Sequence, residues 1–350
     1  MYRTGTLSLP YLYLTGVIIE KRKKNMLVFC DDGSTATKLA WFSKKNLLTN
    51  VFINGFIPEW KADIFSKDKP FNYILDGQKY AYSPNSIEIE VTTNVKYQYS
   101  GINALNIQQA LQQSGLNPQE IDLVVTLPIS EYYDYDGQEN AQKIEKKIQN
   151  IKRNVSLNKG NTFSFRNVFV YPESLPVLVA ILGDDVDPYE RSLVCDLGGT
   201  TFDCGLVMGA FADVLKVSGD HTIGTQTLIK EISNILIKAD THLNFNHIDV
   251  LVRRLLASED VASMINNADL IPQIKEQLEL SVKKLAHKCL DHIERNYDGF
   301  NKIYLTGGGA NLVYELIKQH WEARNVKVIK VDDSQLALVK ALTLIHSDSE

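Results

Sequence analysis

The sequence predicts an α/β protein made of two related half-domains that face each other across a cleft. The prediction rests on one pattern that occurs twice. In residues 27–35 and again in residues 193–203, an apolar run ends in Cys-Asp and is followed by glycine and hydroxyl residues. This pattern indicates a strand, a tight turn and a returning strand. Because the two copies lie far apart in the chain, we expect two similar halves, each presenting a loop and a carboxylate to the space between them.

Each turn has the chemistry of a phosphate-binding loop. Glycine lets backbone N–H groups come close to an anion, and the hydroxyls that follow add hydrogen-bond donors. Asp31 and Asp196, at the ends of the two strands, are suited to hold a hydrated divalent cation against phosphates. A single turn fits an ordinary glycine-rich hairpin nearly as well, so it is the pair that favours a phosphate site.

Composition narrows the class of protein. With 350 residues, of which 44% are hydrophobic, the chain is long enough for two domains with cores of their own. A net charge of −5 argues against broad electrostatic binding to nucleic acid or anionic lipid. Cys30 and Cys195 lie in apolar strands and the chain has no CxxC motif, which predicts buried, reduced thiols and a cytoplasmic protein.

Residues 1–25 are expected to form a dispensable extension. Residues 7–19 are apolar, but the basic run 21–24 follows them, which is the wrong order for a signal peptide. They are also too short for a membrane span. Since Met26 directly precedes the first strand, a natural start of translation at Met26 is the alternative.

In the first half, residues 39–42 are expected to pair with the first strand as a hairpin. Residues 43–100 have a short, aromatic-rich pattern and are interpreted as an inserted subdomain, with a hairpin over 71–82 that turns at Asp-Gly. A helix over 102–114 and a buried strand over 121–128 follow.

The next segments lead to a third candidate carboxylate. Apolar residues at spacings of four, three and four over 144–155 predict an amphipathic helix whose lysines are solvated. A strand over 168–171 then reaches Glu173, which stands between Pro172 and Pro176. The prolines restrict the backbone, which suits a carboxylate that must be aimed, although a lone glutamate is more often a cap or a surface residue.

The second half begins after a loop at 183–188 and contains two further glycine-bearing loops. Residues 218–225 open a helix and are suited to contact phosphate or ribose, although capping explains them nearly as well. A long helix over 274–293 follows, on which His287 and His292 are expected to be solvated. The strand 302–306 then runs into a triple glycine before the last elements of the chain.

In this order the motifs resemble the superfamily of actin, hexokinase and the heat-shock chaperones, in which two half-domains clamp a magnesium nucleotide. They are more closely similar to the bacterial actin-like plasmid-segregation proteins of the ParM (StbA) family. The segments that carry the resemblance are 26–35, 126–128 with 131–134, 172–176, 196–203 and 307–310. Only residues 1–25 fall clearly outside it.

The resemblance implies an actin-like fold with two ribonuclease-H-like halves. Domain I would span residues 26–187, with an insert at about 43–100. Domain II would span 188–334, with an insert at about 225–298, and a C-terminal helix within 335–350 would pack back on domain I.

The resemblance also implies roles for the site residues. Asp31 and Asp196 would orient the waters around Mg²⁺, and Glu173 would position and polarise the attacking water. Lys38, seven residues after Asp31, would neutralise phosphate charge. The phosphates would be cradled by Gly33, Ser34, Thr35, Gly198, Gly199, Thr200 and Thr201. The adenosine would lie along Gly307, Gly308, Gly309 and Ala310, with Gly219, Asp220 and Gly224 beside the sugar.

The function implied is an ATP-driven filament, with GTP as a possible substitute, that hydrolyses its nucleotide and falls apart. Subunits would add head to tail, and the filament would segregate plasmid DNA through a small DNA-binding adaptor, without direct DNA or membrane binding. A small-molecule kinase of the same superfamily is the main alternative, although no second catalytic aspartate stands out. A chaperone ATPase, a membrane-attached cell-shape actin and a regulatory protein that binds nucleotide without hydrolysis are further alternatives.

Overall fold

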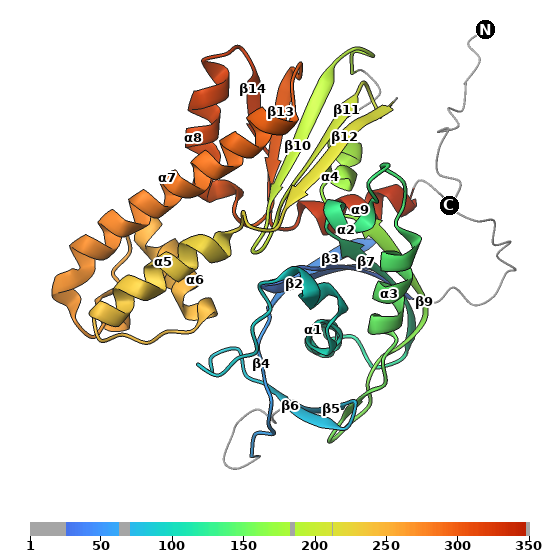
Figure 1. Cartoon of the computed structure of the whole chain (residues 1–350). Helices are drawn as coiled ribbons and strands as arrows, with labels where there is room; N and C mark the ends of the chain where they lie inside the picture. The colour runs from blue at the N-terminus through green and yellow to red at the C-terminus, as the bar shows by residue number, and fades with distance from the viewer. Residues whose placement is uncertain (1–25, 63–70, 183–185, 212, 348–350) are drawn as a thin grey trace, which may run out of the picture.

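The computed structural model describes residues 26–62, 71–182, 186–211 and 213–347 (Figure 1), so the extension expected at 1–25 lies outside the described residues. The described strands are β1 (Leu27–Asp32), β2 (Ala36–Ser43), β3 (Asn46–Ile53), β4 (Phe56–Ile57), β5 (Asn72–Leu75), β6 (Gln78–Tyr82), β7 (Glu120–Leu127), β8 (Val155–Leu157), β9 (Ser164–Pro172), β10 (Arg191–Leu197), β11 (Phe202–Met208), β12 (Asp213–Asp220), β13 (Lys302–Thr306) and β14 (Lys327–Lys330). The α-helices are α1 (Gly101–Gln113), α2 (Ile129–Tyr132), α3 (Ala141–Ile151), α4 (Leu175–Ile181), α5 (Thr225–Lys238), α6 (Phe245–Leu256), α7 (Ile271–Asn296), α8 (Ala310–Glu322) and α9 (Ala337–Ser347). Short 3-10 helices lie at Val95–Tyr99, Ala262–Met264 and Ala268–Leu270.

Two five-stranded sheets repeat one topology. The first has the order β3-β2-β1-β7-β9 and the second the order β12-β11-β10-β13-β14. In each, three strands form an antiparallel meander. A later strand pairs in parallel with the first strand of that meander, and a last strand pairs in parallel with that later strand. The apolar runs of β1 and β10 fill the centres of the sheets, where both faces are covered. The predicted pair of related halves is confirmed.

A smaller sheet, β4-β6-β5-β8, forms the insert of the first half, and α1 lies between it and the main sheet (Figure 1). Its β5–β6 hairpin turns at Asp76-Gly77, both with positive φ, as the Asp-Gly pair predicts. The insert starts later than residue 43, because β3 pairs along its whole length with β2 in the main sheet.

The helix expected over 144–155 ends at Ile151. Four residues later Val155 begins β8, which pairs with β5 and places the β-branched Val155 side chain in the apolar cluster of the insert. The small sheet is therefore completed by a strand from beyond the predicted insert.

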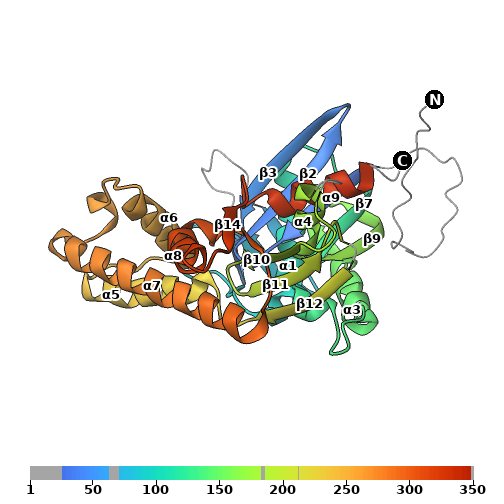
Figure 2. The same ribbon diagram turned by 90° about the horizontal axis from the view of Figure 1, so that it is seen from above.

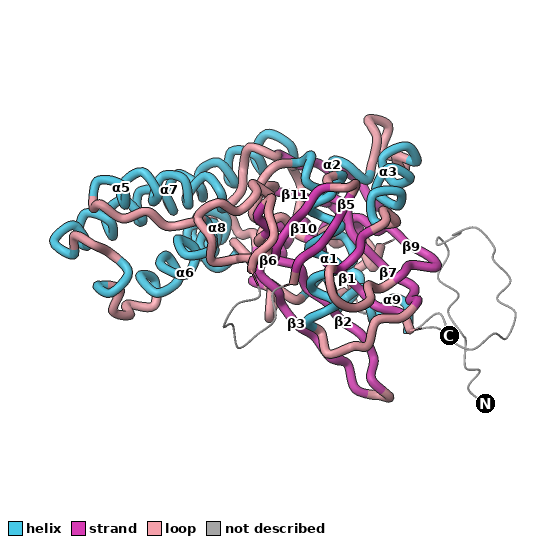
Figure 3. The backbone as a smooth tube through the Cα atoms, turned by 90° about the horizontal axis from the view of Figure 1, so that it is seen from below, coloured by secondary structure: helices cyan, strands magenta, loops and turns pink. Residues whose placement is uncertain are grey.

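Helices α5, α6 and α7 form an arm that projects from the second sheet (Figures 1 and 2). One continuous apolar cluster runs from β10 and β11 into these helices, so the arm is an extension of the core of the second half. Figure 3 shows this helical arm on one side of the strand-rich body.

His292 on α7 is not solvated, contrary to the expectation. Its side chain is 8% exposed, its Nε2 lies 2.8 Å from the Ser218 hydroxyl of β12, and its ring meets the edge of Phe202. His292 lies three residues after the buried Cys289, which places it on the face of α7 that covers the sheet. His287 is exposed, as expected.

The C-terminal helix α9 packs against α4, β1 and β2 of the first half. Phe29 of β1 and Val194 of β10 share one buried cluster with these helices, so a common core joins the two halves. All four cysteines are free and buried. Among the described residues, no helix combines the length and apolar character needed to cross a membrane.

Candidate functional site

A cavity of about 730 Å³ lies between the two halves, within the usual size of small-molecule sites. It is lined by segments that are far apart in the sequence and that meet where β1, β7, β10 and β13 end. The predicted site residues that line it are Asp31, Gly33, Ser34, Thr35, Lys38, Glu173, Asp196, Gly198, Gly199, Thr200, Thr201, Gly307, Gly308 and Gly309.

The two glycine and hydroxyl turns, which we call the first and second phosphate loops (residues 33–35 and 198–201), touch each other across the cavity floor. The Thr200 hydroxyl donates to the Ser34 hydroxyl at 2.8 Å. A Cβ atom on Gly199 would lie 2.5 Å from the Thr35 methyl group, so this approach requires glycine. The repeated motifs therefore form two walls of one site.

Lys38 projects from β2 beside Asp31, and its Nζ lies 3.1 Å from Asp31 Oδ2. The two residues are register partners in the β1–β2 hairpin, which is why a spacing of seven residues brings them together. Burial lowers the pKa of Lys38, but the attraction of Asp31, Glu173 and Asp196 outweighs it, and the net pKa is raised. Lys38 is therefore a permanent cation inside the cavity.

Four carboxylates crowd this region. Burial is the largest cause that raises the pKa of Glu173 well above its usual range, and repulsion by Asp203 and Asp31 adds to it. Burial, followed by Asp31 and Asp203, raises the pKa of Asp196 to about 7. Burial raises the pKa of Asp203 to about 6 and also raises that of Asp31.

This donor set fits a hydrated magnesium ion. No group of three or more His, Cys, Asp or Glu side chains in the described ranges is arranged to hold a metal by itself. Asp31 and Asp196 instead face the same cavity from opposite halves, and their mutual repulsion would be relieved by a cation between them. Magnesium typically takes one or two carboxylates and completes its shell with water and phosphate oxygens.

Glu173 is held by a strained turn. Ser174 has φ 69° and ψ −60°, and Leu175 N–H donates to the Glu173 carbonyl at 2.8 Å. This is the γ-turn with positive φ, which is rare and strained for a residue with a side chain. Glu173 N–H donates to the Leu127 carbonyl at 2.8 Å, so both sides of the residue are fixed. The backbone on both sides of Glu173 is thus held in place, and Glu173 lines the cavity.

Four predicted binding residues do not line the cavity: Gly219, Asp220, Gly224 and Ala310. Gly219 packs toward Asp203 and Ser130, while Asp220 accepts hydrogen bonds from Thr222. Gly224 lies against the backbone of Gly199 and Thr200, and so supports the second phosphate loop from behind.

Sequence reasoning missed a polar stripe on α6. Asn246, Asp249 and Arg253 line the cavity from this helix, and their spacing of three and four residues places them on one face. That spacing is visible in the sequence and could have indicated a polar face on this helix. Ser334 and Gln335 line the cavity from the loop before α9, where no local pattern marks them.

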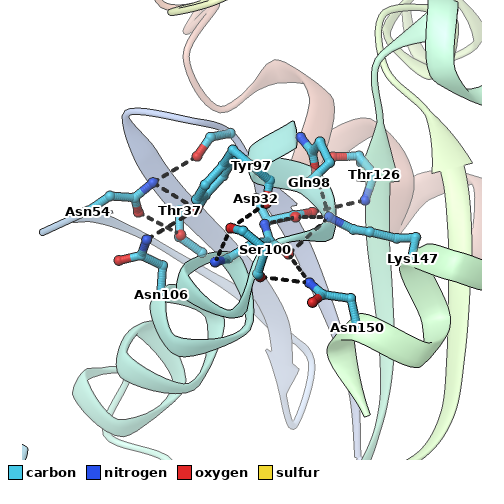
Figure 4. A network of polar contacts seen from close by, with 12 residues as sticks. Asp32, Thr37, Asn54, Tyr97, Gln98, Ser100, Asn106, Thr126, Lys147 and Asn150 are labelled. Atoms are coloured by element: carbon cyan, nitrogen blue, oxygen red, sulfur yellow. Dashed lines mark hydrogen bonds and ion pairs between the residues drawn. The ribbon is translucent and has the colours of Figure 1, made fainter. Parts of the chain in front are cut away.

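Lys147 on α3 is fully buried, although the lysines of that helix were expected to be solvated. Its Nζ donates to Asp32 Oδ2, Gln98 Oε1 and Asn103 Oδ1, so all three donors are used (Figure 4). Asp32 is also fully buried and accepts from Thr126 N–H at 3.2 Å.

Asp31 and Asp32 are neighbours on a strand, so their side chains point to opposite faces. Asp31 therefore serves the cavity, while the Asp32–Lys147 pair anchors the end of β1 from behind.

The chain is similar to solved structures of actin-like proteins. It matches a "pCBH ParM non-polymerisable quadruple mutant" with TM-score 0.68 and 13% identity, over 93% of this chain and 100% of that one. It matches a 15-stranded ParM filament from Clostridium botulinum with TM-score 0.69 and 11% identity, over 93% and 100%. It also matches the archaeal actin homologue Ta0583 in complex with ADP, with TM-score 0.65 and 16% identity, over 92% and 99%. At these identities the likeness establishes the fold, and the predicted actin-like fold is confirmed.

Two family models divide the chain between them. The model described as "Plasmid segregation protein ParM, N-terminal" matches residues 26–184, and that described as "Plasmid segregation protein ParM, C-terminal" matches residues 186–345. Together they cover nearly all of the described residues, and the chain belongs to the family of the plasmid segregation protein ParM.

Proposed function

We propose that the protein binds Mg-ATP in the cavity between its halves, hydrolyses it slowly, and forms filaments whose assembly depends on the bound nucleotide. The observation that carries the proposal is the convergence of both phosphate loops, Lys38 and Glu173 on one cavity in a chain of the ParM family. A ParM filament and an ADP-bound actin homologue among the similar structures support it.

The binding roles follow from the lining. The backbone N–H groups and hydroxyls of the two phosphate loops would hold the phosphates, and Lys38 would neutralise part of their charge. Asp31 and Asp196 would hold the waters of Mg²⁺, which when bound supplies further charge neutralisation on the phosphate oxygens. Gly307, Gly308 and Gly309 offer a surface without side chains for the nucleoside.

Hydrolysis would depend on Glu173. Phosphoryl transfer needs an aligned water and neutralised charge more than covalent help. Burial raises the pKa of Glu173 well above its usual range, and the more basic carboxylate would be a better proton acceptor for a water molecule. The strained turn at Ser174 would fix the direction from which that water is held.

Filament growth would use a head-to-tail contact between subunits, which propagates because it does not close on itself. By its family, the filament would move plasmid DNA through a DNA-binding adaptor, and the net charge of −5 is consistent with such an indirect link. The family match favours this function over a small-molecule kinase.

Sedimentation of the purified full chain with Mg-ATP, Mg-ADP or no nucleotide tests the proposal. We expect protein in the pellet with Mg-ATP and much less with Mg-ADP. Absence of pelleting under all conditions, together with phosphate transfer to an added small acceptor, would instead establish the kinase. Replacing ATP by GTP in the same assay reports the choice of base.

A further inference from the structure

We propose that Asn54 is a positioning residue that holds the first phosphate loop in its binding shape, and that Asn246 of the opposite half controls this hold across the cleft. The consequence for nucleotide affinity rests on the proposed function, whereas the mechanical link does not.

Asn54 directly follows β3 and grips the first phosphate loop from behind (Figure 4). Its Nδ2 donates to the carbonyls of Gly33 at 2.9 Å and Ser34 at 3.1 Å, and its backbone N–H donates to the Thr35 carbonyl at 3.2 Å. Asn54 is 3% exposed and does not line the cavity. It therefore acts on a ligand only through the loop.

Holding these carbonyls orients the donors of the loop. In a trans peptide the C=O of one residue and the N–H of the next point in opposite directions. When the carbonyls of Gly33 and Ser34 are drawn back to Asn54, the N–H groups of Ser34 and Thr35 point away from Asn54, and both of these residues line the cavity. This is the arrangement that an anion-binding loop requires.

Other residues of the first half hold the Asn54 side chain in place. Asn54 Oδ1 accepts from the Thr37 hydroxyl at 2.9 Å, and its Nδ2 also lies 3.1 Å from the Tyr97 hydroxyl. Tyr97 is further held by Asn106 at 3.2 Å (Figure 4). The Asn54 side chain is therefore fixed from the first half before the second half contributes.

The second half reaches Asn54 through its backbone. Asn246, near the start of α6, donates from Nδ2 to the Asn54 carbonyl at 3.0 Å and to the Pro84 carbonyl at 3.0 Å. Asn246 also lines the cavity. One side chain of the arm is thus placed both to face a ligand and to fix the residue that shapes the phosphate loop.

The chain contains a natural control for this link. Asn244, two residues earlier, also donates across the cleft, to the carbonyls of Pro84 at 2.9 Å and Ser86 at 2.7 Å, but it makes no described bond to Asn54. It also caps α6 by accepting from His247 N–H. Asn244→Ser retains a capping oxygen while removing the amide donor. Asn246→Ala and Asn244→Ser therefore each remove two cross-cleft bonds, and of the two only Asn246→Ala removes a bond to Asn54.

Hydrogen–deuterium exchange of the full chain without nucleotide tests the link. For the amides of residues 33–37 we expect roughly fivefold faster exchange in Asn246→Ala, and about tenfold or more in Asn54→Ala, as one or two neutral hydrogen bonds are lost. Asn244→Ser should speed exchange around residues 84–86 and leave 33–37 at the wild-type rate. The inference is overturned if Asn246→Ala affects only 84–86, or if both cleft variants loosen residues 33–37 equally.

A second experiment measures the binding of Mg-ATP, Mg-ADP and adenosine to wild type and to Asn54→Ala. We expect the affinity loss to be largest for Mg-ATP and absent for adenosine, because Asn54 acts through the phosphate loop. An equal loss for all three would show that Asn54 only stabilises the fold. If wild type binds none of them, the proposed function fails, and the exchange experiment still decides whether Asn246 holds the loop.

Discussion

Replacing Lys147 by methionine should strongly destabilise the first half. The substitution keeps an unbranched side chain, one atom shorter, but leaves the fully buried Asp32 carboxylate without its counter-charge (Figure 4). Of its hydrogen bonds to described residues, Asp32 would retain those from Thr126 N–H and from Asn103 Nδ2. Breaking a buried ion pair by removing one partner costs about 3–5 kcal/mol of unfolding free energy. The expected loss in Tm is roughly 6–20 °C.

Two variants make this prediction specific. Asp32→Asn combined with Lys147→Met removes both charges, and the amide can still accept from Thr126 N–H, so the double variant should be clearly more stable than Lys147→Met alone. Lys146→Met removes the adjacent lysine, which is exposed and lies 4.5 Å from the centre of the Tyr99 ring. Its loss should cost no more than about 1 kcal/mol.

Thermal unfolding followed by circular dichroism, without nucleotide, measures these differences. The reasoning about buried charge is refuted if Lys147→Met unfolds at the same temperature as Lys146→Met. It is also refuted if the double variant is no more stable than Lys147→Met.

Two other predictions concern the carboxylates of the cavity. Ser174→Gly should relieve the strained turn and raise the free energy of unfolding by about 1 kcal/mol. Hydrolysis should slow at the same time, because the Glu173 carboxylate is positioned less firmly. Ser174→Ala is the control, since alanine cannot relieve the strain. Thermal unfolding measures the change in stability, and phosphate release measures the change in hydrolysis. Equal unfolding temperatures and equal rates of phosphate release in Ser174→Gly and Ser174→Ala would contradict the account. Because the pKa of Asp196 is raised to about 7, the folded protein keeps a proton there at acid pH, so the stability that this proton provides is lost as pH rises through 7. The waters of a bound magnesium ion would be held best by the ionised carboxylate, so the Kd for Mg-ATP should fall roughly tenfold from pH 6 to pH 8, and Asp196→Asn should flatten this dependence. A profile that is the same in both proteins would exclude Asp196 as the group responsible.

The parts of the site that the sequence predicted are those whose chemistry is local. Gly33 to Thr35 and Gly198 to Thr201 each carry glycine and hydroxyl groups within one turn, and both turns line the cavity. The strand before each turn supplies a carboxylate at a fixed place. The repeat of the motif predicted the repeat of the sheet, because two similar units of sequence fold by the same rules.

What the sequence reading missed depends on contacts between distant segments. Nothing in the local sequence around Asn54 or Asn246 marks them, because their contact forms only when the two halves of the fold come together. Lys147 carried an overlooked signal, since it lies three residues after Ile144 and four before Ile151, on the apolar stripe of α3. A lysine in that position must find a buried partner, and only the fold shows that the partner is Asp32.

The insert boundary was placed too early for a related reason. Strand β3 is half exposed along its length and belongs to the main sheet only through its pairing with β2. Its exposed apolar side chains gave no alternation that would distinguish a sheet strand from an inserted segment.

The central claim, that nucleotide hydrolysis at Glu173 limits the lifetime of a filament, is tested most directly by one time course. Light scattering and phosphate release are followed together after Mg-ATP is added to wild type and to Glu173→Ala. The account predicts that wild type scatters light and then loses the signal as phosphate appears, while Glu173→Ala forms filaments that persist and releases little phosphate. Equal decay and equal phosphate release in the two proteins would contradict it.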